Sequence, residues 1–439
     1  MRRIVLLLAC LFAVACHKYE DEDVIKGVGV IYYTSSDGEV IDLHSTNDFK
    51  VNVVSNIYEN GIGVITFDAP LLWIGAHAFE GCDRLVSVTI PDRVRVIRKS
   101  AFEGCSNLES LTIPGSVTSI GERAFKDCAG LITLTIPDNV EAIGREAFSN
   151  CRNVTSVTIS NSVESIAARL FENCSSLESV IIPDKVQNIG DRAFANCTAL
   201  ADVTIGKIVW SIDDYAFANC VSLSHITIPD GVAWIRYAAF IDCYNLESIE
   251  MGGGITAIYG YAFYGCRKLK NIELGDRVEL IDTYSFYGCS ELTSVVTGNS
   301  LTSIGHNAFY ECGKLKSVVM GDSVTTIGSG AFYGCSNLEN ITLGDKVTSI
   351  GSDAFAWCSK LISITIPRSV TTIGWDAFYG CRSLASVYCK RKTPPAGGAS
   401  MFTNNASERR IYVPRASVDD YKSAEFWKDY SSYIEGFDF

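Results

Sequence analysis

Apolar and polar residues alternate along most of the chain in a pattern that repeats every 23 residues. In the stretch LESLTIPGSVTSIGERAFKDCAG, residues 108–130, Leu108, Leu111 and Ile113 form an L-x-x-L-x-I segment whose alternating end suits a strand with one buried face. Pro114 ends this strand, and across the repeats its position holds only proline, glycine, serine or aspartate. Each repeat therefore begins with a predicted strand and a turn.

The second part of the repeat continues the apolar pattern. Val117 and Ile120 are expected to point inward, and Ala124, Phe125 and Cys128 follow in a predicted short helical turn. Every repeat has Ile at the position of Ile120 and Phe three residues before the cysteine, which indicates stacked, equivalent environments. One coil cannot cover its own apolar side, so neighbouring coils must stack. The pattern predicts an α/β repeat solenoid, mainly β, with parallel strands and short helical turns.

Fourteen of the 17 cysteines follow this period without an insertion or deletion. Equivalent side chains in stacked coils point in parallel rather than toward each other, which disfavours disulfides. No C-x-x-C pair is present for a zinc site. We predict reduced thiols that fill a narrow interior position, with bridges or a metal as the alternatives. The periodic cysteines are Cys82, Cys105, Cys128, Cys151, Cys174, Cys197, Cys220, Cys243, Cys266, Cys289, Cys312, Cys335, Cys358 and Cys381.

The motifs L-x-S-V-T-I-P, V-T-S-I-G and A-F-x-x-C recur in 14 consecutive units, and over residues 62–389 the chain resembles the BspA-type leucine-rich repeat. The resemblance implies a right-handed leucine-rich-repeat superhelix on exported or surface proteins, some of which act as adhesins toward host matrix proteins or other cells. It brings no catalytic residues. The departures from the pattern are local packing changes at Ser160, Leu170, Ser285 and Thr297.

The repeats are expected to occupy residues 62–383, with a cap at each end because a solenoid exposes two apolar ends. Residues 24–61 form the predicted N-terminal β cap. Two hairpins are expected there, one around Asp37-Gly38 and one around Asn60-Gly61, since both dipeptides favour hairpin turns.

Residues 384–439 form the predicted C-terminal cap. A fifteenth strand starts at Leu384, KRKTPPAGG breaks the period, and RIYVP gives one more strand. Ser417 is a candidate cap for a helix through ASVDDYKSAEFWKDY. Aromatic residues of this segment are expected to cover the last coil, namely Phe426, Trp427, Tyr430 and Tyr433.

The first 16 residues, MRRIVLLLACLFAVAC, combine two arginines with an apolar run and small residues, which is typical of an export signal. The ending AVAC resembles a bacterial lipobox, in which the cysteine carries the lipid, although Ala13 stands where Leu is usual. Cys16 is the predicted lipidation site, and Cys10 is the weaker alternative because cleavage there leaves a short apolar run. Residues 17–23, an acidic tether, resemble those of lipoproteins on the outer face of Gram-negative anaerobes. The expected location is therefore the outer membrane, as a cell-surface lipoprotein.

Composition narrows the possible functions. The chain has 439 residues, of which 47% are hydrophobic and 20% charged, so it can bury a large core. A formal charge of -13 disfavours nucleic acid as a partner. The five histidines show no metal-ligand spacing, and no G-x-S-x-G motif or dinucleotide-binding helix occurs. We expect no cofactor, no metal and no enzymatic activity.

Tyrosines recur on one side of the later repeats. The position directly after the invariant Phe faces outward because the Phe itself is buried, and five repeats place Tyr there. Tyrosine offers contact area and a hydroxyl at low entropy cost, which suits protein or glycan surfaces. The structural alternative is that neighbouring rings only stack and stiffen the array. We call these residues, with two nearby tyrosines, the tyrosine flank: Tyr264, Tyr287, Tyr310, Tyr333 and Tyr379, with Tyr261 and Tyr284.

A ladder of threonines on the outward side of the first strand is the other surface pattern. Ile181 interrupts it, and later repeats carry Glu or Val. Its simpler explanation is the β propensity of Thr.

The sequence therefore predicts a lipid-anchored surface protein whose leucine-rich-repeat face binds a host or bacterial macromolecule without catalysis, as in adhesion. The alternatives are capture of a glycan by the tyrosine flank and a purely structural surface spacer. A hydrolase is the weakest interpretation.

Overall fold

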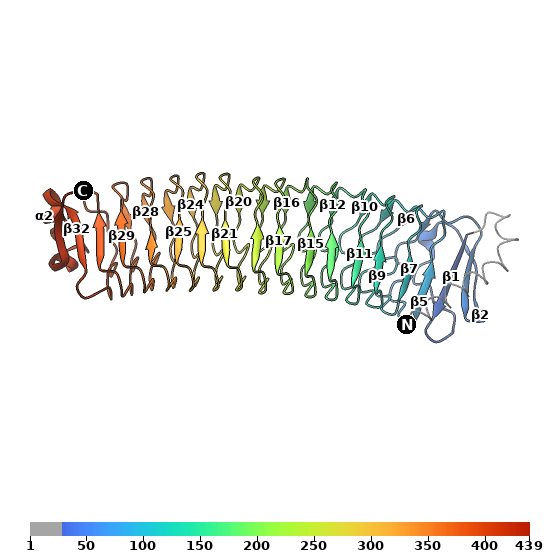
Figure 1. Ribbon diagram of the computed structural model, residues 1–439. Helices are drawn as coiled ribbons and strands as arrows, with labels where there is room; N and C mark the ends of the chain where they lie inside the picture. The colour runs from blue at the N-terminus through green and yellow to red at the C-terminus, as the bar shows by residue number, and fades with distance from the viewer. Residues whose placement is uncertain (1–28) are drawn as a thin grey trace. The chain divides into compact units, whose positions relative to one another are not determined.

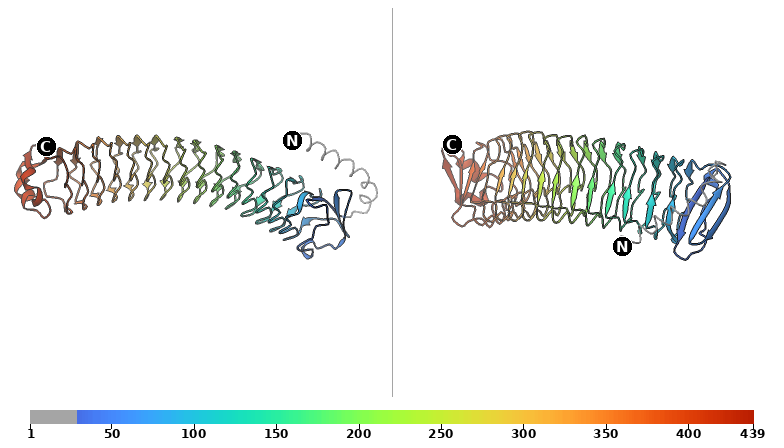
Figure 2. Two further views of the ribbon diagram at one scale, coloured as in Figure 1. Left: turned by 90° about the horizontal axis from the view of Figure 1, so that it is seen from below. Right: turned by 45° about the vertical axis from the view of Figure 1, so that its right-hand side comes forward.

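A computed structural model describes residues 29–439, which divide after Ser162 into two compact units. Unit 1 comprises residues 29–162 and unit 2 residues 163–439. Figures 1 and 2 show that each unit contains stacked coils, and each is described by itself. The predicted export signal, Cys16 and the tether lie outside the described residues.

Each coil has a longer strand, a short strand and a connecting segment of turns. In unit 1 the longer strands are β5 (Leu85–Thr89), β7 (Ser110–Thr112), β9 (Thr133–Thr135) and β11 (Ser156–Thr158), and the short strands are β4 (Trp73–Ile74), β6 (Val96–Ile97), β8 (Ser119–Ile120) and β10 (Ala142–Ile143).

Unit 2 repeats the same elements. Its longer strands are β13 (Ser179–Ile181), β15 (Asp202–Thr204), β17 (His225–Thr227), β19 (Ser248–Glu250), β21 (Asn271–Glu273), β23 (Ser294–Val296), β25 (Ser317–Val319), β27 (Asn340–Ile341), β29 (Ser363–Ile366) and β31 (Ser386–Cys389). Its short strands are β12 (Ser165–Ile166), β14 (Asn188–Ile189), β16 (Ser211–Ile212), β18 (Trp234–Ile235), β20 (Ala257–Ile258), β22 (Leu280–Ile281), β24 (Ser303–Ile304), β26 (Thr326–Ile327), β28 (Ser349–Ile350) and β30 (Thr372–Ile373).

Strands of successive coils pair in parallel with the register of the sequence repeat. Val157 lies opposite Leu134 in unit 1, and Ile304 lies opposite Ile327 in unit 2. The short strands of unit 2 form one parallel sheet from β12 to β30, which the sequence analysis did not anticipate as a sheet of its own. The predicted solenoid with parallel strands, mainly β, is confirmed.

The connecting segment differs in detail from the predicted short helical turn. Its backbone makes turns closed by bonds from residue i+3 to residue i, such as Cys128 N to Phe125 O at 3.3 Å. Arg123 and Asp127, four residues apart, both have left-handed backbone angles, with φ of 57° and 61°. Left-handed residues at this spacing interrupt a right-handed helix. The backbone N–H and C=O groups that a helix would have paired within the segment instead form hydrogen bonds between coils, as from Phe102 N to Ala124 O at 2.8 Å.

The interior of the coils is a column of equivalent side chains. Phe102 and Phe125 stack with ring centroids 5.1 Å apart, and Phe263 and Phe286 in unit 2 do so at 5.2 Å. The Phe rings of the column are fully buried. The cysteines three residues after each Phe are fully buried too, except Cys82, which is nearly buried. In both units the cysteine Sγ donates to the carbonyl oxygen of the Phe in the preceding coil, at 3.1 to 3.4 Å. The repeated thiol is thus a packing residue and a hydrogen-bond donor.

The N-terminal cap contains one of the two predicted hairpins. β2 (Val53–Glu59) and β3 (Ile62–Phe67) pair around Asn60 and Gly61, which both have positive φ as this turn requires. After Asp37-Gly38 the expected second strand does not form. Its Ile41 N–H donates to the hydroxyl of Tyr33, and its carbonyl accepts from Asn56. Side chains thus satisfy backbone groups that a strand would have used.

The first predicted repeat strand, from Ile62, does not stack on the next one. β1 (Val30–Ser35) lies between β3 and β5 and pairs antiparallel with both. The longer-strand stack of unit 1 therefore starts at β5, and β1 to β3 cover its outer edge. A short 3-10 helix, η2 (Asn47–Phe49), places Phe49 in the core beside Phe67, with ring centroids 5.0 Å apart.

The C-terminal cap adds β32 (Arg410–Pro414) and β33 (Ile434–Phe437) in parallel after β31. Ser417 precedes the helix α2 (Val418–Ser423) but makes no side-chain capping bond to it. The helix is shorter than predicted because Ala424 has an extended backbone, with φ of -66° and ψ of 146°. The 3-10 helices η3 (Arg415–Ser417) and η4 (Lys428–Tyr433) flank it. Trp427 is fully buried and lies against Phe402, which continues the Phe column. Of the four aromatic residues predicted to cover the last coil, Trp427 and Tyr430 contact Phe402, whereas Phe426 and Tyr433 are only partly buried.

Candidate binding surface

The repeat itself determines where the tyrosine flank lies. Phe309 is fully buried in the column, and Glu311 two residues later has a left-handed φ of 56°. Tyr310, between them, is half-buried at the surface. Tyr264, Tyr287, Tyr333 and Tyr379 occupy equivalent positions and are half-buried too.

Four of these rings stack in an uninterrupted row. Ring centroids are 4.8 Å apart between Tyr264 and Tyr287, 4.8 Å between Tyr287 and Tyr310, and 4.5 Å between Tyr310 and Tyr333. The planes of each pair are within 8° of parallel. The stacking foreseen as the structural alternative is therefore present. It also makes a rigid aromatic surface, because each ring is held by its neighbours.

A second row lies beside the first. Tyr261 and Tyr284 stack on each other with ring centroids 4.8 Å apart. Tyr261 lies 5.6 Å from Tyr264, and Tyr284 lies 5.7 Å from Tyr287, between ring centroids. Both residues have left-handed backbones, with φ of 60° and 59°. The structure thus brings six of the seven predicted residues into one contact network.

Tyr379, the seventh, is separated from the row by a coil that carries Ala356 in the tyrosine position. Trp357, the next residue, contacts Tyr379 edge to face with ring centroids 5.5 Å apart. The sequence analysis missed Trp357 because it occupies the position before the cysteine, where Gly, Asn and Asp predominate. The aromatic substitution at that position was the available signal.

The network also extends toward the N-terminal side of unit 2. Tyr237 lies 5.3 Å from Tyr261 and 5.5 Å from Tyr215, between ring centroids. Its side chain is 41% exposed. Arg192 covers the ring of Tyr215 at 4.5 Å from the centroid. Neither tyrosine was assigned from the sequence. Tyr215 occupies the repeat position of Tyr261 and Tyr284 but is separated from them by the repeat that carries Ala238 there, and Tyr237 lies one residue before that position.

Ring packing changes the acidity of these phenols. Burial and the neighbouring Tyr333 and Glu311 raise the pKa of Tyr310 to about 12. Burial also raises the pKa of Tyr287, and Glu311 adds to the effect. Tyr287 and Tyr310 therefore present neutral hydroxyl groups at physiological pH.

The repeated thiols are not candidates for chemistry. Burial raises the pKa of Cys243 to about 12, so the nucleophilic thiolate is suppressed. Within residues 29–439 the fifteen cysteines are buried and free, and no group of His, Cys, Asp and Glu side chains could hold a metal ion. The threonine ladder faces solvent as expected, and Ile181, which interrupts it, is 70% exposed.

Comparison with known proteins supports the repeat assignment. The family described as BspA type leucine-rich repeat region matches residues 73–201, 164–293 and 279–408. No curated protein matches the chain. The matches indicate no catalytic family. In the described part of the chain no helix is both long and apolar enough to span a membrane.

Several solved structures are similar. A leucine-rich repeat protein from Bacteroides ovatus is 27% identical, with a TM-score of 0.65, over 91% of this chain and 98% of that one. A leucine-rich repeat protein from Eubacterium ventriosum is 22% identical, with a TM-score of 0.45, over 68% of this chain and 90% of that one. A leucine rich cell surface protein from Faecalibacterium prausnitzii is 24% identical, with a TM-score of 0.42, over 92% of this chain and 98% of that one.

Proposed function

Because the chain belongs to the BspA-type leucine-rich repeat family, we propose that it is a non-catalytic binding protein whose tyrosine flank contacts a protein at the cell surface. The observation that carries this proposal is the row from Tyr264 to Tyr333, four parallel rings that are half-buried rather than hidden. Leucine-rich repeats commonly present such surfaces to macromolecules.

The physical advantage of the row is its preorganisation. Ring stacking holds each side chain in one orientation, so little rotamer freedom is lost on association. The contacts are equivalent and lie one coil apart, so an extended partner can make several of them at once. Tyr287 and Tyr310 have a stacked ring on both faces, and this favours edge and hydroxyl contacts with the partner over insertion of whole rings.

Surface attachment is part of the proposal. We place the chain at the outer membrane through a lipid on Cys16, on the basis of the export signal and the AVAC sequence. Cys16→Ser should release the protein from membranes into the soluble fraction, whereas Cys10→Ser should leave it membrane-bound. If the Cys16→Ser protein stays in the membrane fraction, the proposed lipid anchor on Cys16 is wrong.

The binding role is tested with arrays of matrix proteins, cells and glycans. Tyr264→Ala with Tyr310→Ala interrupts the row, and we expect at least a tenfold loss of affinity for the ligand found. Tyr58→Ala with Tyr244→Ala is the matched control, since it removes two tyrosines outside the flank, and it should change affinity less than twofold. If free sugars compete for the binding, the ligand of the tyrosine flank is a glycan and not a protein. If no ligand is found on the arrays, the result favours the alternative that the protein is a purely structural surface spacer.

A further inference from the structure

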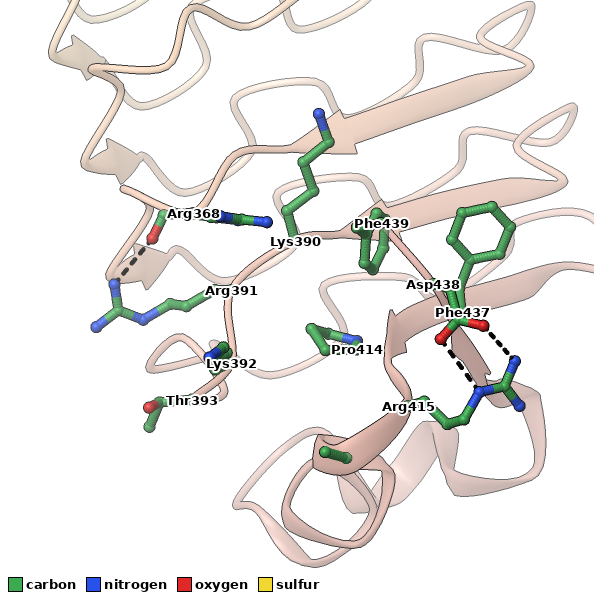
Figure 3. Close-up of a pocket in the computed structure, with 11 residues that line it drawn as sticks. Arg368, Lys390, Arg391, Lys392, Thr393, Pro414, Arg415, Phe437, Asp438 and Phe439 are labelled. Atoms are coloured by element: carbon green, nitrogen blue, oxygen red, sulfur yellow. Dashed lines mark hydrogen bonds and ion pairs between the residues drawn. The ribbon is translucent and has the colours of Figure 1, made fainter.

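A hollow of about 590 Å³ lies in the C-terminal part of unit 2, apart from the residues of the tyrosine flank (Figure 3). Segment 390–393 borders it on one side, and Pro414, Asp438 and Phe439 border it on the other. Its volume falls in the range of sites that hold small molecules or a few units of a polymer.

The hollow is strongly cationic. Five basic residues line it: Arg368, Lys390, Arg391, Lys392 and Arg415. Asp438 is the one acidic residue among the lining residues, and it pairs with Arg415 through two bonds of 3.2 and 2.9 Å. No carboxylate in residues 29–439 lies within ion-pair distance of the other four, so the lining side chains carry five positive charges against one negative. The chain as a whole has a formal charge of -13.

The solenoid does not need arginine at these positions. The equivalent turn position in preceding coils often carries aspartate, whose carboxylate accepts a backbone N–H of the next coil. Asp230 accepts from Gly253 at 2.8 Å, and Asp276 accepts from Asn299 at 3.2 Å. Arginine has no acceptor and cannot make this bond. The last two coils replace aspartate with Arg368 and Arg391, which reverses the charge of this edge.

The two arginines also retain unused donors. One Nη of Arg391 donates to the carbonyl of Arg368 at 3.0 Å, while its Nε is shielded from solvent without an acceptor. A buried donor without a partner is uncommon in proteins. An oxyanion in the hollow would accept from the exposed guanidinium of Arg368 and from the remaining Nη donors of Arg391, since arginine forms paired bonds with carboxylate and similar groups.

Aromatic rings lie beside the cations. Phe437 and Phe439 are each 40% exposed and line the hollow. Phe437 is supported from behind by Tyr388 and Tyr412, with ring centroids 5.6 and 5.4 Å away. Flat apolar faces next to guanidinium and ammonium groups suit a ligand that has both C–H faces and anionic substituents.

We propose that this hollow binds an acidic saccharide, with a carboxylate or sulfate against Arg368 and Arg391 and a sugar face against the phenyl rings. The site contains no residue of the tyrosine flank, so the tests of this proposal and of the proposed function are independent of each other. The anionic group is the recognised chemistry, and it can be a uronate or a sulfate ester.

Isothermal titration of the purified protein with a heparin hexasaccharide, which carries sulfate and carboxylate, and with trigalacturonate, which carries carboxylate alone, tests the site. At least one should bind, and the one that binds identifies the anion. Arg368→Ala with Lys392→Ala should weaken binding at least tenfold. Lys185→Ala with Lys207→Ala removes the same charge from exposed positions of distant coils, and it should change the affinity less than twofold. Phe439→Ala should weaken binding without changing net charge.

Three results would overturn the proposal. The first is failure of both oligosaccharides to bind. The second is an equal loss of affinity in the Lys185 and Lys207 control, because that would mean nonspecific charge attraction. The third is equally tight binding of a compound that lacks one of the two recognised groups, at the same residues. Binding of neutral maltotriose would show that the anion is not recognised, and binding of a hexaglutamate peptide would show that the sugar is not recognised.

Discussion

The thiol of Cys128 donates a hydrogen bond to the carbonyl oxygen of Phe102, one coil earlier, with Sγ 3.1 Å from the oxygen. The same oxygen accepts the backbone N–H of Cys105 at 3.2 Å. Both acceptor positions of a fully buried carbonyl are thus used. This geometry explains why the repeat carries cysteine rather than alanine or valine, which have the required apolar character but no donor.

Replacing one interior thiol should measurably destabilise unit 2. Cys266→Ala removes a bond of 3.3 Å to Phe240 and leaves a small cavity, and we expect a cost of about 1 to 3 kcal/mol in the free energy of unfolding. Urea unfolding followed by circular dichroism measures it. Lys268→Ala, at an exposed position nearby, should have almost no effect. An equally stable Cys266→Ala protein would show that the thiol is only filler.

Thiol labelling should distinguish Cys82 from the other cysteines. Cys82 is 9% exposed, and burial raises its pKa to about 11, whereas Cys266 is fully buried and burial raises its pKa well above the ordinary value. In a protein with Cys10→Ser and Cys16→Ser, a thiol reagent at pH 8 should modify Cys82 first and slowly. After unfolding in urea, all fifteen thiols should react. Rapid modification of most thiols without unfolding would contradict a packed interior.

Unit 1 should lose stability in acid because of Glu146. Burial alone would raise the pKa of this carboxyl, but hydrogen bonds from Lys126 and Arg123, both at 3.0 Å, hold it at about 2. The folded-state pKa is below the ordinary 4.5, so the stabilisation is present above pH 4.5 and is lost as the pH falls toward 2. Glu146→Gln should cost on the order of 3 kcal/mol at pH 7 and reduce the acid dependence.

Unfolding curves of this variant between pH 2 and 7 provide the measurement. Glu141→Gln is the control, since Glu141 is exposed. If the Glu146→Gln protein has the stability and acid dependence of the unmodified chain, the ion pairs of Glu146 with Arg123 and Lys126 do not stabilise the fold.

Tyr310, in the stacked row, should lose its proton at a higher pH than an ordinary tyrosine. Burial and the neighbouring rings raise the pKa of Tyr310 to about 12 from the ordinary 10.0, so its contribution to stability is complete below pH 10 and is lost as the pH rises toward 12. Phenolate absorbance should therefore show a high-pH component that Tyr310→Phe reduces. Because phenylalanine keeps the stacking, Tyr310→Phe should preserve the melting temperature. Tyr310→Ala should lower stability by about 1 to 2 kcal/mol. Titration of all tyrosines near pH 10 would contradict the packed row.

Much of the fold follows from local pattern. The period places Leu108, Ile120 and Phe125 in the core, and all three are buried, because a coil of constant length puts equivalent residues in register. The positions of the tyrosine flank follow from the same register. The left-handed residues in the turns were not foreseen, since Arg123 and Tyr261 are not residue types that signal such angles.

By itself the sequence determined the repeat length, the inward positions and the interior place of the thiols, because these depend on spacing within one coil and its nearest neighbour. Only the tertiary structure decided that β1 enters between β3 and β5, that the tyrosine rings stack, and that Arg368 meets Phe437 and Phe439 around one hollow. These features join segments that are distant in sequence or depend on side-chain orientation. Their geometry is settled by packing between elements, which a periodic pattern does not encode.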